Sequence, residues 1–185
     1  MTTATKPATT TWQIDPAHTD VEFSVRHLML SNVKGRFSTV SGTVTLGEDH
    51  ERPAVDVTID TASIDTRNQM RDDHLRSADF FHSGEYPVMS FKSRELTGDP
   101  YDGFTLSGDL TIRGVTKPVQ LKGMLEGRGN DPWGNERLGY SVSGKIDRRD
   151  FGLTWNQALE AGGVAVGHDV KITINTELVK KTTAD

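Results

Sequence analysis

Apolar and polar residues alternate with a period of two through most of the chain. In 21–26 every second residue is apolar, and the same alternation recurs in 104–112, 138–146 and 168–178. Successive side chains of a β-strand point to opposite faces of the sheet, so this spacing predicts strands with one apolar and one solvated face.

Further strands are expected near 35–46, 54–60, 87–97 and 118–126, where the same residue types recur. Turn-forming stretches such as TGDPYDG at 97–103 separate them. The total is about eight strands joined mostly by hairpins, with no helices regularly between them. This order predicts a mainly β protein, either an antiparallel sandwich or a closed barrel.

One segment departs from this period. TRNQMRDDHLRSADFF at 66–81 is predicted to contain one inserted helix over about 67–78, with Asn68 or Thr66 as its N-cap. A single helix in an all-β chain must pack on the sheet or cover an open end of it. One side of this helix carries Met70, His74 and Leu75.

Length and charge narrow the possible classes of protein. The 185 residues suit one domain, expected over 12–180, after a Thr- and Ala-rich tail at 1–11 that is expected to be disordered. A net charge of -5 gives no basic field that would favour nucleic acid as a partner. No stretch reaches the roughly 18 apolar residues that span a bilayer, and the N-terminal residues lack the apolar core of a signal peptide. A protein of the cytoplasm that does not span a membrane is therefore expected.

Reactive side chains form no recognised catalytic or metal-binding motif. The chain has no cysteine, its six histidines form no HExxH motif, and no GxSxG sequence is present. Asp72 and Asp73 diverge by about 100° on a helix, so they cannot act on one point. No metal and no cofactor are therefore expected. The arginines of 66–81 and of 148–149 are predicted to form internal ion pairs with nearby aspartates rather than to bind phosphate.

An enzyme nevertheless stays open as an alternative. His27 continues the inward parity of the first strand, so it could meet His74 across the mouth of a barrel. A lipid-modifying or hydrolytic enzyme would then use His27, His74 and Asp73.

Three short motifs carry a resemblance to a known family. They are Asp-x-x-His-Thr at 15–19, Asp-x-His-Leu at 72–75 and Arg-Asp-Phe-Gly at 149–152. With LSGDLTIRGVTKPV at 106–119 and VGHDVKITINTEL at 166–178, the chain resembles the YceI family of lipocalin-like, polyisoprenoid-binding proteins.

The resemblance implies a lipocalin-like antiparallel barrel that holds a long amphiphile in an apolar tunnel, often as a homodimer and without enzyme chemistry. We therefore expect a non-catalytic carrier or storage protein for a polyisoprenoid, an isoprenoid quinone or a similar lipid. A ligand-free dimeric structural domain with a filled barrel is the remaining alternative.

Strand parity, the helical segment and the matching motifs together predict the residues that contact the ligand. Met70, Leu75, Phe80 and Phe81 are expected to face the tunnel, while the arginines and aspartates beside them face water. The full predicted set is Phe23, Val25, His27, Phe37, Val57, Ile59, Met70, His74, Leu75, Phe80, Phe81, Phe91, Leu110, Ile112, Val142, Phe151, Trp155 and Ile172.

Overall fold

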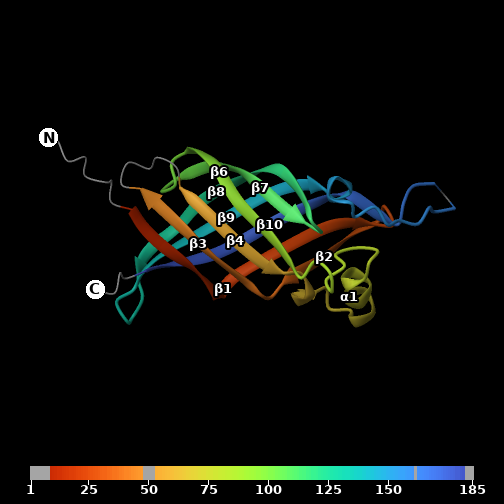
Figure 1. Ribbon diagram of the computed structural model, residues 1–185, viewed down its shortest axis with the longest axis horizontal. Helices are drawn as coiled ribbons and strands as arrows, with labels where there is room; N and C mark the ends of the chain where they lie inside the picture. The colour runs from red at the N-terminus through yellow and green to blue at the C-terminus, as the bar shows by residue number, and fades with distance from the viewer. Residues whose placement is uncertain (1–8, 48–52, 161, 182–185) are drawn as a thin grey trace.

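The protein is a closed antiparallel β-barrel in the computed structural model, which describes residues 9–47, 53–160 and 162–181 (Figure 1). The sheet order is β10-β9-β8-β7-β6-β4-β3-β1-β2-β5, and β10 also pairs with β1, which closes a ring of eight strands. The mainly β barrel with about eight strands is thus confirmed. The strands are β1 (Thr9–His27), β2 (Ser31–Phe37), β3 (Val40–Gly47), β4 (Ala54–Asp60), β5 (Ile64–Asp65), β6 (Val88–Gly98), β7 (Gly103–Ile112), β8 (Val115–Asn130), β9 (Glu136–Asp147) and β10 (Val166–Lys180).

The long strand β1 is shared between two neighbours on the same edge. Thr9–Gln13 pairs with β3, and Val21–His27 pairs with β2. The strand β1 begins at Thr9, and the backbone of residues 9–11 is paired with β3. The expected tail at 1–11 is therefore too long by these three residues. Residues 1–8 lie outside the described residues.

The single α-helix of the described chain, α1 (Gln69–Arg76), lies at one end of the barrel (Figure 1). Asn68 caps it, because its side chain accepts a hydrogen bond of 3.0 Å from the backbone N–H of Arg71. The helix is shorter than the predicted 67–78, since Arg67 has φ +61° and Ser77 is extended. Two short 3₁₀ helices, η1 (Thr61–Ser63) and η2 (Arg148–Phe151), lie at the same end.

Two side chains of α1 lie opposite to the expectation. Asp72 was expected in water but is only 5% exposed, because its carboxylate accepts hydrogen bonds from the backbone N–H (2.9 Å) and hydroxyl (2.6 Å) of Thr66. Met70 was expected inside but is 83% exposed. The segment that leads into α1 covers Asp72. This contact fixes the rotation of the helix about its axis, so Met70 projects into solvent.

Aromatic rings inside the barrel lie over glycines of the neighbouring strands. A Cβ atom on Gly108 of β7 would collide with the ring of Phe91, and one on Gly123 of β8 would collide with Phe104. These glycines therefore make room for rings that point into the barrel.

The helix α1 has eight residues, and no helix within 9–47, 53–160 and 162–181 is long and apolar enough to cross a membrane.

Candidate ligand-binding cavity

The barrel encloses a cavity of about 260 Å³. Every strand of the closed ring contributes apolar side chains to its wall, including Ile14, Leu46, Val55, Met89, Leu106, Leu121, Tyr140 and Ile174. The polar residues on the wall are Thr19, Glu22, Arg148 and Thr176. The cavity reaches from Pro100 at the end with the chain termini to Phe80 and Phe81 at the end with α1.

The size and chemistry of this cavity suit an apolar guest. An engineered apolar cavity of roughly 150 Å³ stays dry and binds benzene, and ordinary ligand pockets measure about 300–1,000 Å³. Water needs two to four polar partners to occupy a cavity stably. An almost wholly apolar wall therefore favours a narrow hydrocarbon chain over water.

Most of the predicted contact residues lie on the cavity wall, and their contact with a ligand remains a prediction. They come from strand positions of inward parity, from the segment around α1 and, for Phe151, from η2. These residues are Phe23, Val25, Phe37, Val57, Ile59, Leu75, Phe80, Phe81, Phe91, Leu110, Ile112, Val142, Phe151 and Ile172.

Four predicted residues do not line the cavity: His27, Met70, His74 and Trp155. His27 is half-buried at the last position of β1, where it pairs with Val166. Met70 projects into solvent, as described above. His74 and Trp155 pack behind the cavity wall, with ring centroids 4.7 Å apart, and His74 also contacts Phe80 at 5.1 Å.

Two residues of the enzyme alternative, His74 and Asp73, are engaged at the surface. His74 Nε2 lies 2.9 Å from Asp79 Oδ2. Asp73 accepts hydrogen bonds from Gln69 at 2.8 Å and from Arg76 at 3.1 Å. Neither side chain belongs to the cavity wall. The side chains of His74 and Asp73 therefore hold the segment around α1 together, and they do not face the cavity in which an apolar substrate would lie.

Arg71 and Arg148 depart from the predicted pattern of ion pairs, and Arg71 donates to the hydroxyl and carbonyl oxygens of Thr66. Arg76 and Arg149 do pair with aspartates, Asp73 and Asp147. The guanidinium of Arg148 instead donates hydrogen bonds to four backbone carbonyl oxygens, and the side chain is 4% exposed. Burial lowers the pKa of Arg148. The four acceptors belong to Leu153, Trp155, Val166 and Gly167.

These bonds fasten the chain between η2 and β10 around the α1 end of the cavity. An ion pair was expected because Asp150 is close in sequence. The carbonyl groups of the folded loop are acceptors that no sequence pattern reveals.

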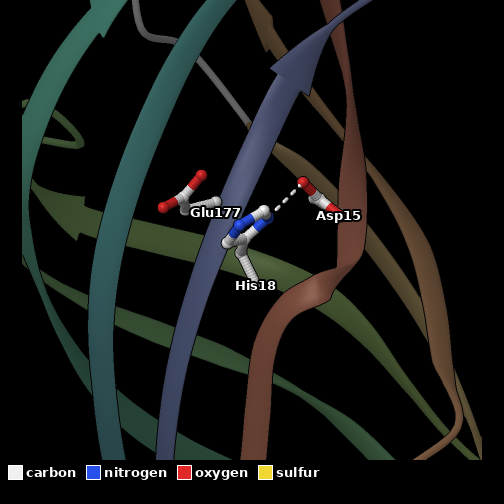
Figure 2. A group of neighbouring side chains, drawn as sticks. All are labelled: Asp15, His18 and Glu177. Carbon is white, nitrogen blue, oxygen red and sulfur yellow. Dashed lines mark hydrogen bonds and ion pairs between the residues drawn. The ribbon is translucent and has the colours of Figure 1, made fainter. Parts of the chain in front are cut away.

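A group of charged and polar side chains lies outside the cavity, where β1 leaves its regular pairing with β10. The register shifts between Ile14 and Thr19, and Pro16 lies in this bulge. Figure 2 shows Asp15 and His18 on β1 beside Glu177 on β10. One ligand atom from each lies within 4.8 Å of the others, which is close enough for a metal ion.

The positive charge at this group is supplied by Arg137. Its guanidinium lies 2.7 Å from Asp15, 2.9 Å from Glu177 and 3.0 Å from Asp131. The hydrogen bond from Arg137 is the main reason why the pKa of Asp15 falls to about 2, and the bond with His18 at 2.8 Å adds to it. The group therefore acts as an ion-pair network at the seam of the barrel. The motif Asp-x-x-His-Thr at 15–19 is visible in the sequence, but nothing in it indicates that Arg137 is the partner of Asp15.

A closed eight-stranded antiparallel barrel with an internal apolar cavity and a helix at one end places this protein among the lipocalin-like barrels. The model of the YceI-like domain family matches residues 12–178, and the chain belongs to that family.

Relatives agree with this assignment. The chain is 45% identical over 139 residues to Protein YceI of Escherichia coli O17:K52:H18, a match that covers 74% of this chain and 71% of that protein. The crystal structure of the Campylobacter jejuni YCEI protein is 34% identical with a TM-score of 0.71, covering 98% of this chain and 100% of that one.

A third structure is more distant. A polyisoprenoid binding domain from Saccharophagus degradans, implicated in plant cell wall breakdown, is 17% identical with a TM-score of 0.63. It covers 95% of this chain and 100% of that one, and at this identity the likeness concerns the fold.

Proposed function

We propose that the protein binds one long apolar amphiphile of the isoprenoid type inside the barrel. It acts as a carrier or a store, and it releases the lipid unchanged. The observation that carries this proposal is the cavity, whose wall is apolar in every strand of the ring.

Burial of a hydrocarbon chain supplies the main favourable free energy for such a function. Each buried CH₂ group contributes about 0.8 kcal/mol, so a chain of ten carbons gains about 8 kcal/mol, which is comparable to the cost of about 4–15 kcal/mol for association. The polar end of the ligand finds few partners along the wall. We therefore place the tail inside and the polar head at one end of the barrel.

Three of the four polar wall residues, Thr19, Thr176 and Arg148, support binding rather than catalysis, while the fourth, Glu22, is exposed to solvent. Thr19 and Thr176 are hydrogen-bonded to each other, with 2.8 Å between their hydroxyl oxygens. Arg148 is occupied by carbonyl groups. A catalytic group needs a free acid, base or nucleophile within reach of the reacting bond, and these side chains are engaged with the protein itself.

A solved structure of the same fold supports the same ligand class. The Saccharophagus degradans domain of the same fold is described as polyisoprenoid binding. We extend that ligand class to this chain because apolar side chains from every strand of the ring line its cavity.

The proposal is tested by the dependence of affinity on chain length. Delipidated protein is titrated with prenols of five, ten, fifteen and twenty carbons, followed by calorimetry. We expect one site per chain and an affinity that rises with each isoprene unit until the cavity is full. An affinity that does not change between five and twenty carbons would overturn the proposal.

A further inference from the structure

The turn between β1 and β2 exposes three consecutive apolar side chains. Leu28, Met29 and Leu30 are 38%, 53% and 78% exposed. Isolated apolar residues are common on protein surfaces, but a run of three at the tip of a turn is unfavourable unless it has a function. We call Leu28–Leu30 the apolar turn.

The backbone of the apolar turn is strained and firmly held. Leu28 and Met29 have φ values of +49° and +59°, in the left-handed region that asparagine and glycine adopt more easily. The backbone N–H of Leu28 donates to the carbonyl of Ala165 at 2.8 Å, and that of Leu30 donates to the carbonyl of His27 at 3.0 Å. The guanidinium of Arg26 donates to the carbonyl of Met29 at 3.0 Å. The turn therefore presents its side chains in a fixed position.

The apolar turn lies beside the α1 end of the cavity. Val25 and Val166 both line the cavity, and His27 pairs with Val166 just before the turn. The strand β1 thus leads from the cavity wall directly into the exposed side chains. In Figure 1, β1 and β2 meet at the same end of the barrel as α1.

Two exposed cations, Arg26 and Lys34, flank the apolar turn on β1 and β2. Between Phe23 and Gly47 the sequence contains Arg26, Lys34 and Arg36 but no carboxylate, in a chain with a net charge of -5. Arg36 lies 3.4 Å from Asp65, whereas Arg26 and Lys34 are exposed. Exposed apolar tips flanked by cations are the combination that binds the interface of a phospholipid bilayer.

We propose that the apolar turn docks the barrel on the surface of a lipid bilayer. Leu28, Met29 and Leu30 enter the boundary between head groups and acyl chains, while Arg26 and Lys34 contact lipid phosphates. The bound lipid then enters and leaves at the α1 end. This inference rests on the proposed function, because it names the surface from which the ligand is collected.

The test is flotation of the full chain with vesicles of phosphatidylcholine, with and without 30% phosphatidylglycerol. The variant is Met29→Gln with Leu30→Gln. The matched control is Trp133→Gln, since Trp133 is 81% exposed on the turn between β8 and β9, at the other end of the barrel. A second variant, Arg26→Gln with Lys34→Gln, tests the contribution of charge.

We expect the wild type and Trp133→Gln to float with the vesicles, and the Met29/Leu30 variant to lose about tenfold or more of its binding. The Arg26/Lys34 variant should lose the extra binding that phosphatidylglycerol gives. The affinity of the Met29/Leu30 variant for a twenty-carbon prenol in solution should stay unchanged, while prenol transfer between vesicles slows. Unchanged prenol affinity keeps the test of docking separate from the test of the cavity.

Three results would overturn docking. One is a wild type that does not float with either vesicle, and another is a Met29/Leu30 variant that floats like the wild type. The third is a wild-type dimer that the same variant converts to a monomer without any vesicle binding, since the turn would then face a second copy of the chain.

Discussion

Arg137 of β9 lies 2.7 Å from Asp15 of β1, although β10 runs between these two strands. The same guanidinium lies 2.9 Å from Glu177 on β10 itself. One side chain therefore ties three consecutive strands together at the place where the pairing of β1 with β10 is interrupted. The barrel is closed there by ion pairs as well as by backbone hydrogen bonds.

This network predicts a loss of stability in acid. The pKa of Asp15 is lowered from 3.8 to about 2, mainly by the hydrogen bond from Arg137. A lowered pKa means that the folded state binds fewer protons than the unfolded state in this window. The contribution of Asp15 is thus present above about pH 4 and is lost as the pH falls toward 2. Urea unfolding at pH 5, 4 and 3 measures this loss.

Arg137→Gln should lower the free energy of unfolding at pH 7. It should also make the decrease of this free energy between pH 5 and pH 3 smaller than in the wild type. The control is Lys145→Gln, which removes the exposed pair of Lys145 with Asp169 (2.9 Å) and should change stability little. A pH profile of Arg137→Gln parallel to that of the wild type would show that the network does not link these strands.

Filling the cavity should block the ligand without unfolding the barrel. Ile112 and Val142 lie on the cavity wall, on β7 and β9. Ile112→Trp or Val142→Trp should cost about 1–3 kcal/mol through overpacking and weaken prenol binding by roughly tenfold or more. Calorimetric titration and thermal melting measure the two effects. Gln120→Trp, at an exposed position on β8, is the control and should bind normally. Normal prenol binding by both cavity variants would place the ligand elsewhere.

Asp72 should be the carboxylate that holds α1 in place. It is buried and accepts two hydrogen bonds from Thr66. Asp72→Ala leaves these donors without their partner and should cost about 1–3 kcal/mol, measured by urea unfolding. The neighbouring Asp73, whose side chain is 61% exposed, provides the control Asp73→Ala. Equal losses for the two variants would contradict the structural role of Asp72.

His74 should contribute to stability and not to chemistry. Its ring contacts Trp155 and Phe80, and Nε2 lies 2.9 Å from Asp79. His74→Ala should cost about 1 kcal/mol, the usual value of an aromatic contact, and should leave prenol affinity within a factor of two or three of the wild type. Metal analysis of the purified wild type and variant should agree. Stoichiometric metal that disappears in His74→Ala would favour the enzyme alternative.

The cavity wall could be predicted from sequence because it depends on local periodicity. Phe91, Leu110 and Val142 lie on the inward parity of their strands, and strand parity survives any error in where a strand begins. The capping residue Asn68 was likewise visible, because an N-cap is a local feature.

The remaining features depend on contacts between distant parts of the chain. Asp15 and Arg137 are 122 residues apart, so no local pattern pairs them. Met70 and Leu75 are both apolar residues of one helix, and only the rotation fixed by Asp72 decides which of them faces the barrel. The carbonyl acceptors of Arg148 exist only once the loop around it has folded.

The most direct test of the proposed function is mass spectrometry of the lipid that copurifies with the protein. Wild-type protein and Ile112→Trp are purified in parallel without detergent and extracted with organic solvent. We predict a long-chain isoprenoid lipid near one molecule per chain in the wild type and far less in Ile112→Trp. A wild-type extract with no lipid, or the same lipid in equal amount from both proteins, would contradict a lipid-binding cavity.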